Sequence, residues 1–139
     1  MDADRPVATA LGLDHIVLVV ADVERSLAWY EHHFGLDGVR VDAWRAGSVP
    51  FPSLRVDVGM IIDLIPGDPR AEGSRLDHIC FVVTEEDLDA LRAAPDLSVE
   101  AEGSRFGAQG VAQSIYVRDP DGLLVEARAY PAASSPHDP

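Results

Sequence analysis

The amino-acid sequence predicts an α+β domain in which two tandem βαβββ modules form one curved mixed sheet around a central cavity. The prediction depends on an internal repeat. The segment Leu13–Val20 (LDHIVLVV) recurs at Leu76–Val83 (LDHICFVV), with six of eight residues identical. The offset is 78 − 15 = 63 residues, and the same offset relates Gly59–Asp63 (GMIID) to Gly122–Glu126 (GLLVE) without a gap. In such a fold the helices lie on the outer face of the sheet, which leaves the other face free to curve around a cavity.

The first module spans about residues 11–67 and begins with a strand over 13–20, a run rich in β-branched residues. A helix follows, because Asp22 is a typical N-cap and Gly35 suits the left-handed residue after a helix. Between them, apolar residues recur at helical spacing. Three further strands are expected near residues 38–44, 51–57 and 59–65.

The second module spans about residues 74–130 and repeats this order, with a strand over 75–83. Thr84 followed by Asp87 resembles a capping box and predicts the start of the helix. The segment 104–110 contains two glycines and is expected to be a flexible loop over the site, with Arg105 as a candidate substrate contact. The three remaining strands are expected near residues 97–102, 113–118 and 122–129.

Length and composition indicate one soluble globular domain. The chain has 139 residues, and we expect its polar start (1–10) and its Ala/Ser/Pro-rich end (131–139) to be disordered, leaving a single domain over 11–130. The net charge of −13 opposes nucleic-acid binding. One cysteine, the lack of a signal-peptide pattern and the absence of an apolar run of about 20 residues indicate a cytoplasmic protein that does not bind membranes.

Four ionisable residues interrupt apolar strands at positions related by the repeat: His15 and His78, and Asp63 and Glu126. A carboxylate inside a buried strand costs several kcal/mol unless its charge is compensated. A divalent metal would compensate two carboxylates and two imidazoles together, and this set suits Zn, Ni, Co, Mn or Fe(II) without choosing among them. The alternative for each residue is a hydrogen-bonded core histidine or an ion-paired acid.

These residues also carry a family resemblance. Asp14-His15-Ile16, Asp77-His78-Ile79 and the segment 116–126 (YVRDPDGLLVE), together with Trp29-Tyr30 and Phe34-Gly35-Leu36, resemble the vicinal oxygen chelate superfamily. That superfamily includes glyoxalase I, methylmalonyl-CoA epimerase, fosfomycin-resistance transferases, extradiol dioxygenases and bleomycin-resistance proteins. The resemblance covers about residues 11–130 and implies a vicinal-oxygen-chelate domain. Its metal ligands fall on His15, Asp63, His78 and Glu126.

The resemblance favours a divalent-metal-dependent glyoxalase- or epimerase-like enzyme, a lyase or isomerase, acting on a small substrate with vicinal oxygens. Glu126 or Asp63 would move the proton. The fourth-strand position is usually glutamate in the glyoxalase branch, so the shorter Asp63 would bind the metal directly, bind it through water, or act as a base beside it. The alternatives are a non-catalytic antibiotic-binding protein of the bleomycin-resistance type and an Fe(II) extradiol dioxygenase. The open sheet edges predict a homodimer.

Overall fold

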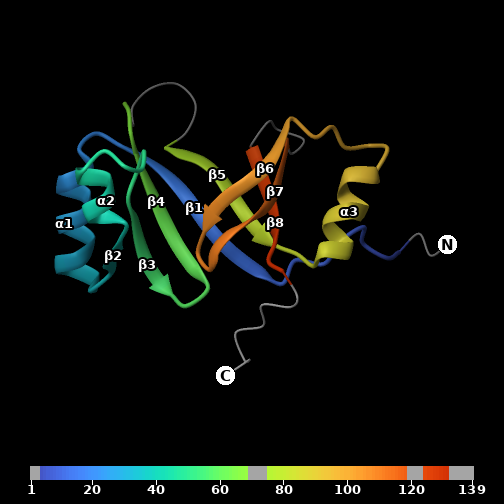
Figure 1. The fold of residues 1–139 in the computed structure, drawn as a ribbon, viewed down its shortest axis with the longest axis horizontal. Coiled ribbons are helices and arrows are strands. Elements are labelled where there is room, and N and C mark those ends of the chain that lie inside the picture. Colours follow the sequence, from blue (N-terminus) through green and yellow to red (C-terminus); the bar gives the residue numbers. More distant parts are fainter. Residues whose placement is uncertain (1–3, 69–74, 119–123, 132–139) are drawn as a thin grey trace.

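A computed structural model describes residues 4–68, 75–118 and 124–131. Eight strands form one mixed sheet in the order β2-β3-β4-β1-β5-β8-β7-β6 (Figure 1). Helices α1 and α2 lie at one end of this sheet and α3 lies at the other. The predicted α+β fold with a mixed sheet is therefore confirmed. The strands are β1 (Gly12–Val20), β2 (Asp37–Val39), β3 (Ser53–Asp57), β4 (Met60–Pro66), β5 (Leu76–Val82), β6 (Ala101–Gly107), β7 (Gly110–Arg118) and β8 (Leu124–Ala129).

The two halves of the sheet have the same strand order. In each half the first strand pairs in parallel with the last, β1 with β4 and β5 with β8. An antiparallel pairing of β1 with β5 joins the halves. The four central strands β4, β1, β5 and β8 are therefore those that carry Asp63, His15, His78 and Glu126.

The two longer helices begin and end where their capping residues predict. Helix α1 (Val23–Phe34) starts after Asp22, whose side chain accepts a hydrogen bond from the Arg25 amide at 3.0 Å, and it ends at Gly35 with φ 67°. Helix α3 (Glu85–Ala93) starts after Thr84, which accepts from the Asp87 amide at 3.1 Å. These local signals act within one turn of helix, so tertiary packing does not override them.

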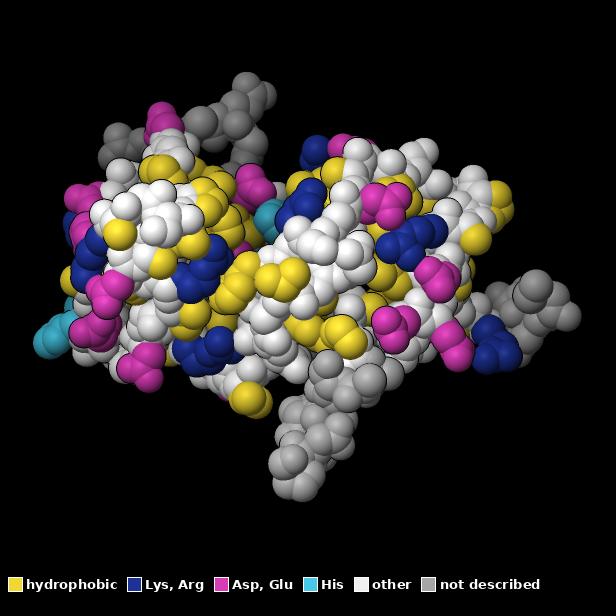
Figure 2. Space-filling view, viewed as in Figure 1, with side chains coloured by type: hydrophobic (Ala, Val, Ile, Leu, Met, Phe, Trp, Pro, Cys, Tyr) yellow, Lys and Arg dark blue, Asp and Glu magenta, His cyan; other side chains and the backbone are white. Residues whose placement is uncertain are grey.

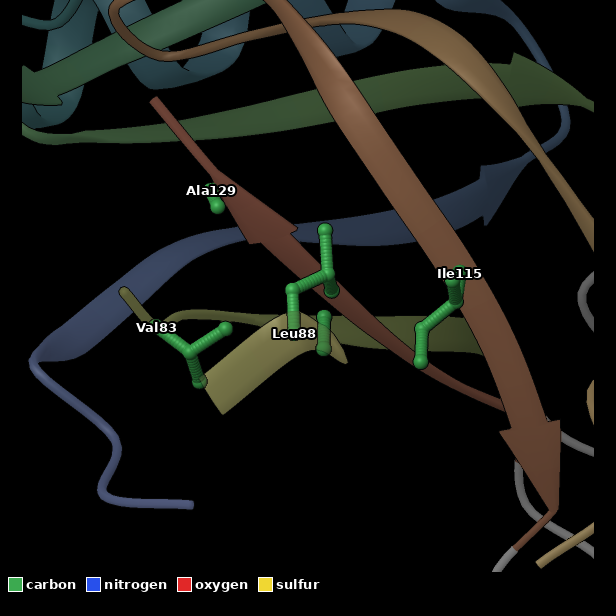
Figure 3. Close-up of a cluster of buried hydrophobic side chains, with 5 residues drawn as sticks. Val83, Leu88, Ile115 and Ala129 are labelled. Atoms are coloured by element: carbon green, nitrogen blue, oxygen red, sulfur yellow. The ribbon is translucent and has the colours of Figure 1, made fainter. Parts of the chain in front are cut away.

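Each helix covers its own half of the sheet. Val23 and Leu27 of α1 pack against Leu54 of β3 and Leu64 of β4. Figure 3 shows the corresponding cluster under α3. In that cluster the buried residues are Val83, Leu88, Ile115, Ala127 and Ala129.

The predicted strand over 38–44 is wrong in its second half. Strand β2 ends at Val39, Arg40 takes a left-handed backbone conformation with φ 61°, and a short helix α2 (Val41–Arg45) follows. Val41 and Trp44 both pack against the core beneath α1. Their spacing of three residues puts them on one face of a helix, whereas a strand would place them on opposite faces.

The segment 104–110 is not the flexible loop that its glycines predict. Its first four residues belong to β6 and its last begins β7, so the turn is only Ala108 and Gln109. The Ala108 amide donates to Oδ2 of Asp14 at 3.0 Å, and the Gln109 amide donates to the Tyr130 hydroxyl at 3.0 Å. This hairpin is therefore anchored at its tip.

The described part of the N-terminal segment lies beside α3 (Figure 1). Ala8 packs against the core there, and the Thr9 amide donates to Oδ2 of Asp87 at 2.8 Å. Residues 132–139, most of the tail expected to be disordered, lie outside the described residues. No helix of the described part is both long and apolar enough to cross a membrane.

Candidate metal centre

All four predicted site residues line one cavity on the inner face of the sheet, with a volume of about 460 Å³. His15, Asp63 and Glu126 are buried, and the side chain of His78 is 13% exposed. Figure 2 shows basic, histidine and acidic side chains meeting in the hollow between the two halves of the molecule. The cavity is thus polar at its base and open to small molecules.

Three of the four side chains converge. Oε1 of Glu126 lies 3.1 Å from Nε2 of His15 and 3.2 Å from Nε2 of His78. Neighbouring ligand atoms around one octahedral ion also lie about 3 Å apart. Asp63 is adjacent to this set, with its Oδ2 3.8 Å from Nε2 of His15.

A β-bulge orients each histidine. Asp14 is the extra residue on β1 between paired Leu13 and His15, and Asp77 is the extra residue on β5 between Leu76 and His78. A bulge breaks the alternation of side chains, so an acid and the histidine after it can meet. In both strands Nδ1 of the histidine lies 2.7 Å from Oδ2 of the preceding aspartate. Each Nε2 therefore points into the cavity.

The two aspartates have different surroundings. Asp77 is 41% exposed and bonds only His78 among the described residues, whereas Asp14 is fully buried. Tyr130 donates to Oδ1 of Asp14 at 2.5 Å, and Nε of Arg128 lies 3.9 Å from the same oxygen. Burial would raise the pKa of Asp14, but hydrogen bonds from His15, Tyr130 and the Ala108 amide, with the charge of Arg128, lower it.

Each cavity carboxylate is held at one oxygen. The Ser53 hydroxyl donates to Oδ1 of Asp63 at 2.5 Å, and Ser53 is the residue opposite Asp63 on β3. The Ser114 hydroxyl donates to Oε2 of Glu126 at 2.7 Å, and Nη1 of Arg128 donates to the same oxygen at 3.1 Å. The second oxygen of each acid, Oδ2 or Oε1, consequently faces the histidines.

The pKa values follow from burial and from these contacts. Burial alone would lower the pKa of His15, but hydrogen bonds with Asp14 and Glu126 and the charges of Glu126 and Asp63 raise it to about 9. Burial would raise the pKa of Glu126, but His15 and His78 lower it. The pKa of Asp63 is raised, because burial outweighs the effects of His15 and Ser53.

The donor set fits a divalent ion. His15, His78 and Glu126 offer two imidazole nitrogens and a carboxylate oxygen within 4.8 Å of one another. Nε2 of His78 is buried and makes no hydrogen bond with the described residues, so an ion would give it a partner. The aspartates at Nδ1 match the carboxylate partners that metal-bound histidines commonly have.

Several residues of the site escaped prediction from the sequence. Asp14 and Asp77 recur with the histidines in the repeat, which was a signal, but regular alternation would place them on the opposite face. Arg128 lies in β8 two residues after Glu126, and only the structure shows its buried hydrogen bonds. Arg40, Phe51, Phe106 and Tyr116 also line the cavity and have no counterpart in the repeat pattern.

Comparison of sequences identifies related proteins. The family model of the Glyoxalase/Bleomycin resistance protein/Dioxygenase superfamily matches residues 12–127. Virulence protein STM3117 of Salmonella typhimurium is 30% identical, over 85% of this chain and 83% of the relative. Fosfomycin resistance protein FosX of Listeria innocua is 25% identical, over 85% of this chain and 89% of the relative.

Solved structures share the fold at low sequence identity. Methylmalonyl-CoA epimerase from Mycobacterium tuberculosis has a TM-score of 0.61 at 20% identity, covering 93% of this chain and 95% of its own. The Mn(II)-bound glyoxalase from Novosphingobium aromaticivorans has a TM-score of 0.65 at 22% identity, covering 88% of this chain and 40% of its own. These likenesses show the fold.

Proposed function

The chain belongs to the glyoxalase/bleomycin resistance protein/dioxygenase superfamily, and from this membership we propose that it is a divalent-metal-dependent, glyoxalase- or epimerase-like enzyme. Its substrate would be a small molecule with two neighbouring oxygen atoms. The observation that carries the proposal is the convergence of His15, His78 and Glu126 within 4.8 Å in a cavity.

In this proposal His15, His78 and Glu126 hold the ion. A bound divalent ion would act as a Lewis acid that polarises a substrate oxygen. Asp14 and Asp77 hold the two imidazoles in the orientation that presents Nε2, and Ser114 with Arg128 fixes the Glu126 carboxylate. Such support keeps the three ligand atoms in place before any ion arrives.

Asp63 is the proposed proton carrier. Its Oδ1 is held by Ser53, while its Oδ2 faces the cavity 3.8 Å from Nε2 of His15. Burial raises the pKa of its carboxyl, which suits a group that takes a proton from carbon and returns it. Glu126 is less suited, because both of its oxygens face donors and the histidines lower its pKa.

A second candidate function is Fe(II) extradiol dioxygenation. Two histidines and one carboxylate are the ligand set of many non-haem Fe(II) oxygenases, and three ligands converge here. The position of Asp63 favours the first proposal, because dioxygenation needs no second carboxylate beside the three ligands. Oxygen consumption separates the two candidates.

The test is a panel of assays on the full chain, stripped of metal and reloaded anaerobically with Mn, Co, Ni, Zn or Fe(II). The panel contains a glutathione hemithioacetal, a 2-methyl-branched acyl thioester followed by deuterium exchange, fosfomycin with water or a thiol, and catechols with an oxygen electrode. We expect metal-dependent turnover of a non-catechol substrate without oxygen uptake. Catechol cleavage with oxygen uptake would replace the first proposal by the second.

Two variants separate the proposed proton transfer by Asp63 from the proposed metal binding by Glu126. Asp63→Asn should abolish turnover while the metal content stays near one ion per chain, whereas Glu126→Gln should lose the ion. Asp37→Asn is the control, because Asp37 is exposed on β2 outside the cavity. Unchanged turnover in Asp63→Asn would remove Asp63 from the mechanism. Metal-independent binding of an antibiotic, with no turnover of any substrate, would indicate a binding protein instead.

A further inference from the structure

Two arginines from opposite halves of the sheet line the cavity. Arg40 precedes α2 in the first half, and Arg105 lies on β6 in the second half. Both line the cavity that contains the three converging ligands. The chain has no lysine, eleven arginines and a net charge of −13, and two of these arginines line this cavity.

The guanidinium groups rest on aromatic rings. Cζ of Arg40 lies 4.1 Å from the ring centroid of Phe106 and 5.8 Å from that of Phe51. Cζ of Arg105 lies 5.7 Å from the ring centroid of Tyr116. Stacking on a ring holds a guanidinium in place while N–H groups in its plane can still donate. Nη1 of Arg105 donates to the Ser104 carbonyl oxygen at 3.0 Å, and the other N–H groups of this guanidinium can donate to a ligand.

Neither arginine has an acidic partner among the residues that the structure describes. Elsewhere in that part of the chain, Arg45, Arg92 and Arg118 form ion pairs with carboxylates. The acids that line the cavity are already engaged. Asp63 accepts from Ser53, Asp77 from His78, and Glu126 from Ser114 and Arg128.

Two features of the backbone accommodate the side chains of Arg40 and Arg105. Arg40 is the one non-glycine residue of the described chain with a positive φ, a conformation that L-residues adopt at a cost. At Gly103 a Cβ atom would lie 2.7 Å from Nη1 of Arg105, so glycine leaves the room that this guanidinium occupies.

We propose that Arg40 and Arg105 form an anion subsite, and that the substrate carries a carboxylate, phosphonate or phosphate group besides its chelating oxygens. The chelating end of this substrate rests on the proposed function, while the anionic end rests on the two arginines alone. Planar guanidinium groups match such oxyanions by paired N–H donation. They would decide which vicinal-oxygen compounds enter.

The test compares ligands with one chelating head and different tails. Lactate and glycerate have uncharged tails, malate has a carboxylate and 3-phosphoglycerate has a phosphate. Their dissociation constants are measured by calorimetry on the Mn²⁺-loaded and the metal-free full chain. We expect malate or 3-phosphoglycerate to bind at least about tenfold tighter than lactate, and the better of the two identifies the tail.

Arg40→Gln and Arg105→Gln remove one charge each, and glutamine at position 40 meets the same positive φ as arginine. Each should reduce the preference for the charged tail, and the double variant should abolish that preference, with a smaller loss of affinity for lactate than for malate or 3-phosphoglycerate. Arg45→Gln, which makes the same charge change outside the cavity, should keep the full preference.

Equal binding of all four ligands to the wild type would overturn the anion subsite, as would a preference that survives in the double variant. If neither Mn²⁺ nor Co, Ni, Zn or Fe(II) binds, the proposed function fails. The subsite is then judged on the metal-free protein, in which the charged-tail ligands must still bind tighter than lactate and glycerate.

Discussion

Asp14 and Asp77 occupy equivalent places in the two halves, yet only Asp14 is fully buried. Its carboxylate accepts from His15, Tyr130 and the Ala108 amide, so it positions an imidazole and ties β1 to the tip of the β6–β7 hairpin. In the proposed metal centre, such a residue would act on a bound ion through the histidine that it orients.

Asp14→Asn should therefore weaken metal affinity, by about 10–100-fold. The asparagine keeps the size of the side chain but not the charge that balances His15 and Arg128. Mn²⁺ titration followed by electron paramagnetic resonance measures the change. Asp77→Asn is the matched control and should lose less, because solvent can replace its exposed carboxylate. An equal or larger loss in Asp77→Asn would contradict the positioning role of Asp14.

The pKa of His15 predicts a proton release. At neutral pH its imidazole is protonated in the metal-free protein, since the pKa is about 9, and a bound ion must displace that proton. Metal affinity should rise with pH up to about 9 and then level off. By the same linkage, protonation of His15 stabilises the metal-free fold fully below pH 6.5 and less as pH rises through about 9.

Calorimetry in two buffers of different ionisation enthalpy measures this release. We expect about one proton or more per ion bound at neutral pH. Binding heats that do not depend on the buffer, or an affinity that stays flat up to pH 9, would show that metal binding does not displace a proton from His15.

Among the elements, those with local signals were predictable. The caps at Asp22 and Thr84 and the glycine at 35 define helix ends from a few neighbouring residues, and the structure agrees. Helix α2 was not predictable in the same way. Its residues alternate like a strand near Val39 and Val41, and only packing against α1 and β3 selects the helix.

The four site residues that the sequence predicted were identified through the internal repeat. It identified His15, His78, Asp63 and Glu126, because histidines and acids inside apolar strands are costly and recur at one offset. The bulges at Asp14 and Asp77 could not be derived, since they depend on the pairing of β1 with β5. Arg40 reaches the cavity from a left-handed backbone position before α2 that no periodicity encodes. Arg105 was a candidate from the sequence, but it lies on β6 and not in a flexible loop.

The packing of the β6–β7 hairpin against Arg128 and Asp14 can be tested by substitution of a glycine. A Cβ added at Gly107 would collide with the Arg128 guanidinium and lie 2.7 Å from Oδ2 of Asp14. Gly107→Ala should lower the free energy of unfolding by about 1–3 kcal/mol, measured by urea denaturation. Gly12→Ala, where a Cβ meets nothing within 4 Å, should change it by less than about 0.5 kcal/mol. Equal stability of the two variants would mean that Arg128 has room to move.

At the scale of the whole molecule, the sheet ends in two unpaired edges, β2 and β6. Exposed edges favour association, so the expectation of a homodimer stands. Light scattering at micromolar concentration should give about 30 kDa, twice the chain mass of 15.0 kDa. A mass of one chain would contradict it.

The fold brings one proposed ligand from the first half of the sheet and two from the second to a shared cavity, so the proposed metal centre depends on the pairing of β1 with β5. Electron spin-echo spectroscopy of one equivalent of Mn²⁺ tests this centre most directly, because it detects the nitrogen nuclei bound to the ion. We expect two imidazole nitrogens in the wild type, one in His78→Gln, and no tightly bound ion in Glu126→Gln. A bound ion without nitrogen coupling, or an unchanged spectrum in His78→Gln, would contradict a site formed by His15, His78 and Glu126.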